Sequence, residues 1–72
     1  MKNWINVERA KRKMTQDELA KALKVSRHSI NGIEAERYMP SAEIAMRIAR
    51  YFNVKMEDIF FLEDEQYYYD RT

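Results

Sequence analysis

Two short predicted helices joined by a two-residue turn constrain this chain more than any other feature of its sequence. Residues 15–18, Thr-Gln-Asp-Glu, form a capping box, in which the threonine and glutamate side chains satisfy free backbone amides at a helix start. Ser26 starts a second helix in the same way, because its hydroxyl can accept from an amide of the first turn. Only Lys24 and Val25 separate the two helices. Helices joined so closely must cross at a steep angle.

The second of these helices begins at Arg27 and has two unlike faces. Ile30 and Ile33 lie three positions apart, so they are expected to face a core. Arg27, His28 and Asn31 then lie on the opposite side, pointing away from that core. A short helix with this division is laid out to contact a partner, and the pair forms a helix-turn-helix arrangement.

The other apolar positions predict three further helices. With one glycine, one proline and little alternation of apolar and polar residues, the whole chain is expected to be an all-α, five-helix fold. The expected boundaries are a first helix ending near Lys13, a third ending near Glu36, a fourth capped by Ser41 and stopped by left-handed Asn53, and a fifth from about Met56 to Phe60.

Length and composition exclude several classes of protein. A chain of 72 residues hides only roughly 60% of its unfolded surface, which leaves no room for a deep substrate pocket. The sequence has one histidine, no cysteine, no metal-ligand spacing and no glycine-rich phosphate loop, so we expect no enzyme activity, cofactor, metal or small-molecule ligand. It has no apolar run of about 18 residues and a polar start, so we expect a cytoplasmic protein without a membrane partner.

Charge divides the chain into two parts. Residues 63–72 hold four acidic residues against Arg71, a net charge of −3, so residues 1–62 carry +4 of the total of +1. We expect one domain over residues 1–62 and an acidic, tyrosine-rich tail over residues 63–72. A basic domain suits an anionic partner, but an ordinary solvated surface explains the same charge. The run Lys11–Lys13 is equally open, since it either complements a helix dipole or lies near a phosphate.

A longer pattern resembles a known family. The matching segments, at fixed spacing, are residues 15–20, 25–27, 33–34, 37–38, 40–41, 44–45, 48–49 and 59–60. Over residues 5–62 the chain resembles the phage Cro/CI type of helix-turn-helix regulator, also called the Xre family. The resemblance implies a five-helix DNA-binding domain that acts as a homodimer on a palindromic operator in double-stranded DNA, most often as a repressor.

The resemblance also implies roles for individual residues. Gln16 matches a position that holds a DNA phosphate, and Arg27, His28 and Gly32 match three positions that face base edges in the major groove. Glycine has no side chain to offer, so base reading falls on Arg27 and His28, joined by the amide of Asn31. The implied DNA-binding set is Gln16, Ser26, Arg27, His28, Ser29, Asn31, Gly32, Arg37 and Tyr38, of which the last two match a loop that lies on the DNA backbone. Arg9 and Glu34 match a pair expected to form a partly buried salt bridge.

Three departures from the family pattern stand out. Lys24 replaces the usual glycine of the turn, where a left-handed conformation costs a lysine roughly 1 kcal/mol. Ala35 and Glu36 replace Asn-Gly after the third helix, which favours a helix one or two residues longer. Gly32 weakens the middle of its helix by roughly 1 kcal/mol and indicates either a close approach to DNA backbone or simple tolerance.

The two ends of the chain complete the expectations. Residues 60–62, Phe-Phe-Leu, are too apolar to lie in water. The family resemblance implies that residues 2–4 lie near them, and because the two ends pair in some small members of the family, we expect a short antiparallel unit here. A homodimer contact is expected through the fifth helix and residues 59–69. The alternative function is an antitoxin-like, protein-binding module that uses residues 61–72. The run Tyr67–Tyr69 is compatible with a disordered tail, a partner-binding patch or a strand.

Overall fold

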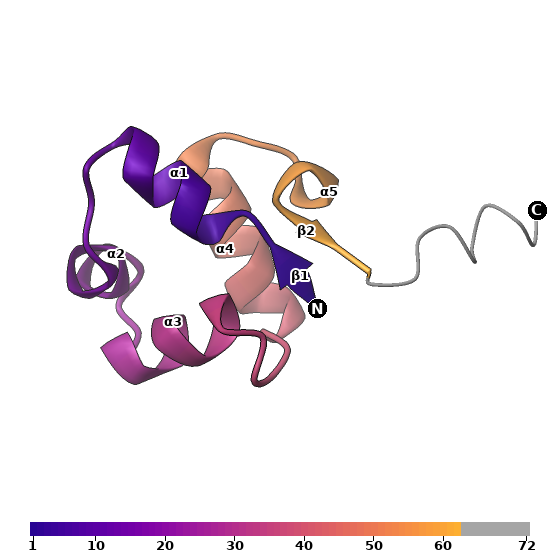
Figure 1. Ribbon diagram of the computed structural model, residues 1–72, viewed down its shortest axis with the longest axis horizontal. Helices are drawn as coiled ribbons and strands as arrows, with labels where there is room; N and C mark the ends of the chain where they lie inside the picture. Colours follow the sequence, from indigo (N-terminus) through magenta and orange to yellow (C-terminus); the bar gives the residue numbers. More distant parts are fainter. Residues whose placement is uncertain (63–72) are drawn as a thin grey trace, which may run out of the picture.

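The computed structural model describes residues 1–62, which form five helices and one two-stranded sheet (Figure 1). The expected five-helix fold is therefore confirmed. The elements are β1 (Lys2–Asn3), α1 (Ile5–Lys11), α2 (Gln16–Leu23), α3 (Arg27–Glu34), α4 (Ala42–Phe52), α5 (Met56–Ile59) and β2 (Phe60–Phe61). The predictions for the acidic tail and the run Tyr67–Tyr69 lie outside the described residues.

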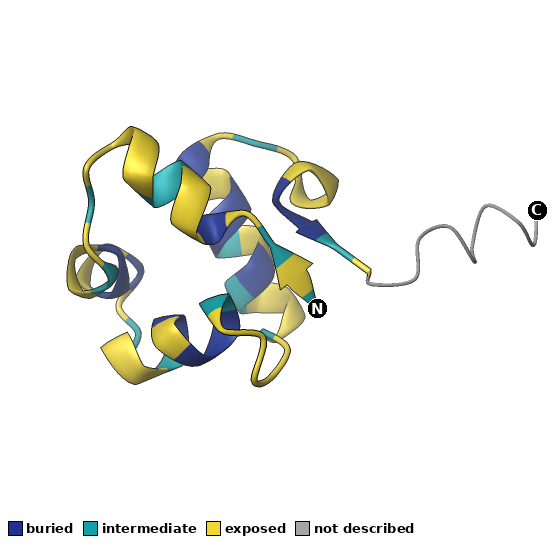
Figure 2. Cartoon of the chain, in the orientation of Figure 1, coloured by how far each residue is buried: buried dark blue, intermediate teal, exposed yellow. Residues whose placement is uncertain are grey.

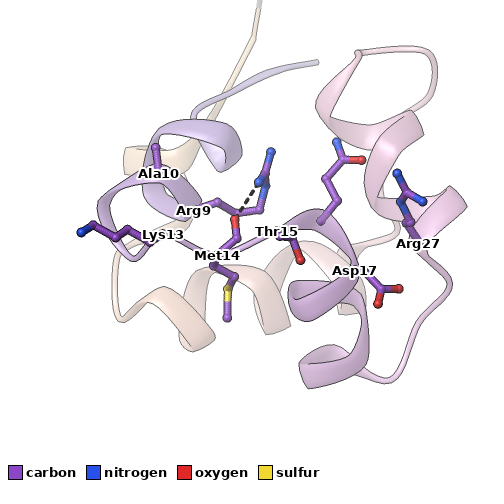
Figure 3. A pocket seen from close by; sticks show the side chains of 8 residues that line it. Arg9, Ala10, Lys13, Met14, Thr15, Asp17 and Arg27 are labelled. Atoms are coloured by element: carbon purple, nitrogen blue, oxygen red, sulfur yellow. Dashed lines mark hydrogen bonds between the residues drawn. The ribbon is translucent and has the colours of Figure 1, made fainter.

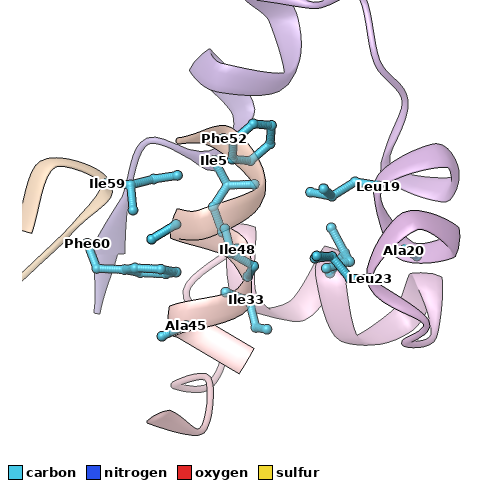
Figure 4. Close-up of a cluster of buried hydrophobic side chains, with 12 residues drawn as sticks. Ile5, Leu19, Ala20, Leu23, Ile33, Ala45, Ile48, Phe52, Ile59 and Phe60 are labelled. Carbon is cyan, nitrogen blue, oxygen red and sulfur yellow. The ribbon is translucent and has the colours of Figure 1, made fainter. Parts of the chain in front are cut away.

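The hydrophobic core is built around α4. Its buried face carries Ala45, Ile48, Ala49 and Phe52, at the spacing of one helical stripe. Figure 4 shows the buried side chains of α2 on one side of α4 and those of α5 and β2 on the other. The remaining core residues are Ile5, Leu19, Ala20, Leu23, Ile30, Ile33, Ile59 and Phe60. Burial of each large aliphatic or aromatic side chain contributes about 1.5–3 kcal/mol, so a core this small holds each helix through only a few contacts.

Side-chain caps set the starts of the three helices that the sequence marked most clearly. Thr15 Oγ1 accepts from Glu18 N at 3.0 Å while Glu18 Oε1 accepts from Thr15 N at 2.8 Å, which completes the capping box. Ser26 and Ser41 cap α3 and α4 by accepting from the amides of Ser29 and Ile44. Each such cap contributes about 1 kcal/mol. These helix starts could be predicted because each cap joins residues only three positions apart.

Left-handed residues set the helix ends, and two of the predicted ends are wrong. Lys24 (φ 59°) and Asn53 (φ 58°) are left-handed, as expected. However, α1 ends at Lys11 rather than near Lys13, because Lys13 is itself left-handed (φ 53°). Likewise α3 ends at Glu34 rather than near Glu36, because Glu36 adopts φ 63° and turns the chain back.

The chain ends pair as predicted. Strands β1 and β2 are antiparallel, with Lys2 opposite Phe61 and Asn3 opposite Phe60. Trp4 N donates to Ile59 O at 2.8 Å, and the Trp4 ring lies 5.4 Å from that of Phe61. Trp4 is therefore the N-cap residue of α1 and packs against the terminal sheet. None of the helices within residues 1–62 has the length and apolar character needed to cross a bilayer.

Candidate nucleic-acid interface

Helix α3 has the two faces that the sequence predicted. Ile30 and Ile33 are buried, and Figure 2 shows both buried and exposed stretches along this helix. Arg27, His28 and Asn31 are exposed, and together they line a hollow of about 260 Å³. A guanidinium, an imidazole and an amide thus share one open surface. Arginine and asparagine are the side chains that pair with guanine and adenine in the major groove.

The start of α3 carries two of the predicted site residues. Ser26 Oγ accepts from Ser29 N at 3.0 Å and lies 2.8 Å from Ser29 Oγ. Ser26 is exposed and Ser29 is half-buried. Both hydroxyls therefore serve first to hold the helix start that places Arg27 at the surface.

Gly32 is buried, because the ring of Tyr38 lies on it. A Cβ atom at position 32 would lie 2.2 Å from Tyr38 Cε1, so no larger residue fits unless the ring moves. The Tyr38 hydroxyl lies 3.1 Å from His28 O and 3.2 Å from Ser29 O and can donate to either carbonyl. The close approach at Gly32 is therefore made by the same chain. This packing supplies a reason for the glycine that neither sequence-based alternative contained.

A bidentate ion pair joins α1 to α3. Arg9 Nε donates to Glu34 Oε2 at 2.6 Å, and Arg9 Nη2 donates to Glu34 Oε1 at 2.9 Å. The two side chains are only 18% and 9% exposed, which confirms the partly buried salt bridge. Arg9 Nη1 also donates to Met14 O at 2.8 Å, drawn as the dashed line in Figure 3. The hydrogen bonds to Glu34 raise the pKa of Arg9, so this guanidinium stays charged.

A basic pocket lies where α1 ends and where α2 and α3 begin. Its volume is about 490 Å³, and its lining includes Arg9, Lys13, Gln16 and Arg27, with Asp17 as the single carboxylate. In the view of Figure 3, Lys13 and Arg27 lie on opposite sides of it. The charge of Arg9 is compensated by Glu34, so Lys13 and Arg27 remain against one carboxylate. Together with the positive end of α2, they favour an anion such as a DNA phosphate.

Side-chain amides link three of the predicted site residues, a connection that the sequence did not reveal. Gln16 Nε2 donates to Glu34 Oε1 at 3.2 Å, and Asn31 Nδ2 donates to Gln16 Oε1 at 3.2 Å. Arg37 Nη2 donates to Asn31 Oδ1. We call Glu34, Gln16, Asn31 and Arg37 the amide relay. The two bonds made by Gln16 span 15 and 18 positions along the chain, and they form because α2 packs on α3.

The basic run that ends α1 is divided between two tasks. Arg12 turns away from the pocket: it donates to Glu8 Oε1 at 2.9 Å and to Phe52 O at 3.1 Å. Its guanidinium also lies 4.7 Å from the centre of the Phe52 ring. Lys13, by contrast, lines the basic pocket. Lys13 could have been found from the sequence, because it is a basic residue that lies between the end of the first helix and Gln16, the residue expected to hold a DNA phosphate.

In residues 1–62, no three His, Cys, Asp or Glu side chains gather where they could hold a metal ion.

Comparison with known proteins identifies the family. A family model described as helix-turn-helix matches residues 7–59. An uncharacterized HTH-type transcriptional regulator of Methanocaldococcus jannaschii is 48% identical over 66 residues, which cover 92% of this chain and 100% of that protein. A regulator of the same description from Archaeoglobus fulgidus is 47% identical over 92% of this chain and 93% of its own length. The regulator YgzD of Bacillus subtilis is 38% identical over 90% of this chain and 98% of its own.

These matches cover both the helix pair at the surface and the helices that support it. The family consists of transcriptional regulators and is not a class of enzymes. The chain belongs to the Xre-type helix-turn-helix family of DNA-binding transcriptional regulators.

Proposed function

We propose that this protein is a cytoplasmic repressor that binds a palindromic operator as a homodimer. The observation that supports this most is the exposed group Arg27, His28 and Asn31, held on α3 by two buried isoleucines. Two copies place their α3 helices in adjacent major grooves, about 34 Å apart, the half-site spacing of two-fold helix-turn-helix dimers. RNA polymerase is then excluded from an overlapping promoter.

The side chains divide into those that read bases and those that position the protein. Arg27 is assigned to the O6 and N7 acceptors of a guanine, and Asn31 to an adenine or a phosphate. His28, next to Arg27 on the same open surface, is assigned to a neighbouring base edge. The other predicted residues at the surface, Gln16, Ser26, Ser29, Arg37 and Tyr38, are assigned to positioning. Gly32 is buried and contributes only by leaving room for the Tyr38 ring.

Apolar side chains exposed near the terminal sheet and α5 support the homodimer. Trp4 is 49% exposed, Leu62 is 41% exposed and Met56 is 39% exposed. Trp4 follows β1, Leu62 follows β2 and Met56 begins α5, and Figure 1 shows these elements away from α2. Exposed apolar surface commonly marks an interface, and a two-fold dimer covers the same surface on both copies.

Titration of two variants against operator and random duplex DNA tests the base-reading assignment. Arg27→Ala is expected to lose about 1–3 kcal/mol per half-site on the operator and much less on random duplex, because it removes a base contact. Gln16→Ala is the matched control, since loss of a phosphate contact weakens binding to both duplexes alike. Equal losses on the two duplexes for Arg27→Ala would contradict the assignment.

A further inference from the structure

The two ends of the amide relay fix the orientation of the two amides between them. An arginine side chain can only donate hydrogen bonds, and an ionised glutamate can only accept them. Arg37 therefore needs an oxygen from Asn31, and Glu34 needs an N–H from Gln16. The contact between the two amides then joins Asn31 Nδ2 to Gln16 Oε1, as observed at 3.2 Å. A reversal of either amide would set two donors, or two acceptors, against each other.

This orientation decides which atoms remain for a partner. Each amide oxygen in the relay accepts one bond and keeps a second lone pair, and each amide nitrogen uses one of its two N–H groups in the relay. The second N–H of Gln16 and that of Asn31 are left for an external acceptor. Gln16 lines the basic pocket and Asn31 lines the hollow on α3. These two oriented N–H groups can donate to a phosphate oxygen.

The loop after α3 holds Arg37 in the position that the relay needs. Left-handed Glu36 turns the chain back, and Arg37 N donates to Gly32 O at 3.0 Å. The Tyr38 ring packs on Gly32 and its hydroxyl reaches the carbonyls of His28 and Ser29. With its backbone fixed on both sides, Arg37 meets Asn31 rather than extending into solvent.

We propose that Arg37 is a positioning residue, which supports DNA binding by orienting Asn31 and Gln16 instead of by holding a phosphate itself. This inference rests on the proposed function. It assigns to Glu34 a second task besides its ion pair with Arg9, namely to fix which end of the Gln16 amide faces the DNA.

A double-mutant cycle on a random-sequence duplex tests the proposal. Arg37→Ala is expected to lower the affinity about fivefold in the otherwise unchanged protein and less than about twofold in the Gln16→Ala background, because residues of one hydrogen-bond network couple. Equal fold-changes in the two backgrounds would overturn the proposal. Lys13→Ala is the matched control, since this cation lines the same pocket without joining the relay and its effect should be the same in both backgrounds.

The salt dependence of binding separates an indirect role from a direct one. A cation that holds a phosphate releases a counterion, and its removal lowers the slope of log affinity against log salt by about 0.9. The relay predicts an unchanged slope for Arg37→Ala and a smaller slope for Lys13→Ala. Arg37→Gln should keep affinity within about twofold of the unchanged protein, because its amide can still donate to Asn31 Oδ1. A salt slope lowered by Arg37→Ala would overturn the positioning role of Arg37. A loss of affinity for Arg37→Gln as large as that for Arg37→Ala would overturn it as well.

Nuclear magnetic resonance of the DNA-free protein shows whether Arg37→Ala is folded and whether the relay is changed. The Gln16 side-chain amide signal is expected to shift in Arg37→Ala while the backbone signals of α4 stay in place, and an unmoved Gln16 signal would overturn the relay. Failure of the unchanged protein to bind any duplex would overturn the proposed function together with this inference. Binding with additive losses would overturn the inference alone.

Discussion

The two ends of this small domain are held together by different forces. At the end formed by α2, α3 and the close of α1, Glu34 accepts from Arg9 and Gln16, and the amide relay extends these bonds to Arg37. At the end formed by the terminal sheet and α5, the Trp4 and Phe61 rings pack together beside buried Ile59 and Phe60. Figure 1 shows α4 between the two ends.

The difference indicates two different partners. Polar groups that are already oriented suit a charged partner such as DNA, and binding through them weakens as salt screens the charges. Exposed apolar groups suit a partner that also presents apolar surface, and the burial of such surface depends little on salt. One thin core therefore supports a DNA-facing end and an end suited to a second copy of the chain.

Removal of one partner of the ion pair at the polar end should destabilise the protein strongly. Glu34→Ala is expected to lower the free energy of unfolding by about 2–3 kcal/mol, because it leaves the Arg9 guanidinium mostly out of water without its partner. Urea unfolding followed by circular dichroism measures the loss. Glu43→Ala is the control, since Glu43 is 80% exposed and lies 3.9 Å from Arg47, a surface pair worth about 0–0.5 kcal/mol. Similar losses for the two variants would show that the polar end is not stabilised in this way.

The apolar end should control self-association. Trp4→Ala is expected to raise the dimer dissociation constant about tenfold or more, because an exposed tryptophan at an interface commonly contributes more than about 1.4 kcal/mol. Sedimentation equilibrium at low and high salt measures the constant. Met39→Ala is the control, since Met39 is 62% exposed but lies on the loop after α3. A dissociation constant unchanged by Trp4→Ala would place the dimer contact elsewhere.

The contact between the Tyr38 ring and Gly32 is an aromatic contact at the polar end, and its contribution to α3 can be measured separately. In the Tyr38→Ala background, Gly32→Ala is expected to stabilise the protein by about 1 kcal/mol, the gain in helix propensity. With Tyr38 present, the added methyl displaces the ring and most of this gain is lost. Thermal unfolding of the four proteins measures both changes. The same gain in both backgrounds would mean that the Tyr38 ring contributes nothing to α3.

The smallest effect concerns Glu8, whose partner Arg12 lies on Phe52. The hydrogen bond from Arg12, and then that from Lys11, lowers the pKa of Glu8 below the ordinary glutamate range. Glu8 therefore contributes stability above that range, and the contribution is lost as the pH falls through it to the lowered pKa. Glu8→Gln should remove about 0.5 kcal/mol at pH 7 and nothing in strong acid. Unfolding at both pH values measures this, and an equal loss at each would contradict the charge effect.

Much of the fold was predictable because its signals are local. The caps at Thr15, Ser26 and Ser41 depend on side chains three residues from the amides that they satisfy. The family resemblance implied a left-handed Lys24, because glycine is usual at that turn, and Asn53 follows from where the apolar stripe of the fourth helix stops. These features need no knowledge of the tertiary structure.

The errors and omissions arise where tertiary contacts decide. Lys13 and Glu36 are left-handed without the glycine or asparagine that usually marks such a position, so the ends of α1 and α3 were placed too late. The packing of Tyr38 on Gly32 depends on how the following loop folds back. The relay needs α2 and α3 in contact before Gln16 and Asn31 can meet. The sequence could therefore name these residues but not their partners.

Selection of binding sites from random duplex DNA, by the unchanged protein and by Arg27→Ala, tests most directly whether the open side of α3 reads bases. The unchanged protein is expected to select a two-fold symmetric sequence with half-site centres about 10 base pairs apart. Arg27→Ala should select the same sequence with one base preference lost in each half. A pool without a common sequence, or an identical sequence from both proteins, would contradict base reading by Arg27.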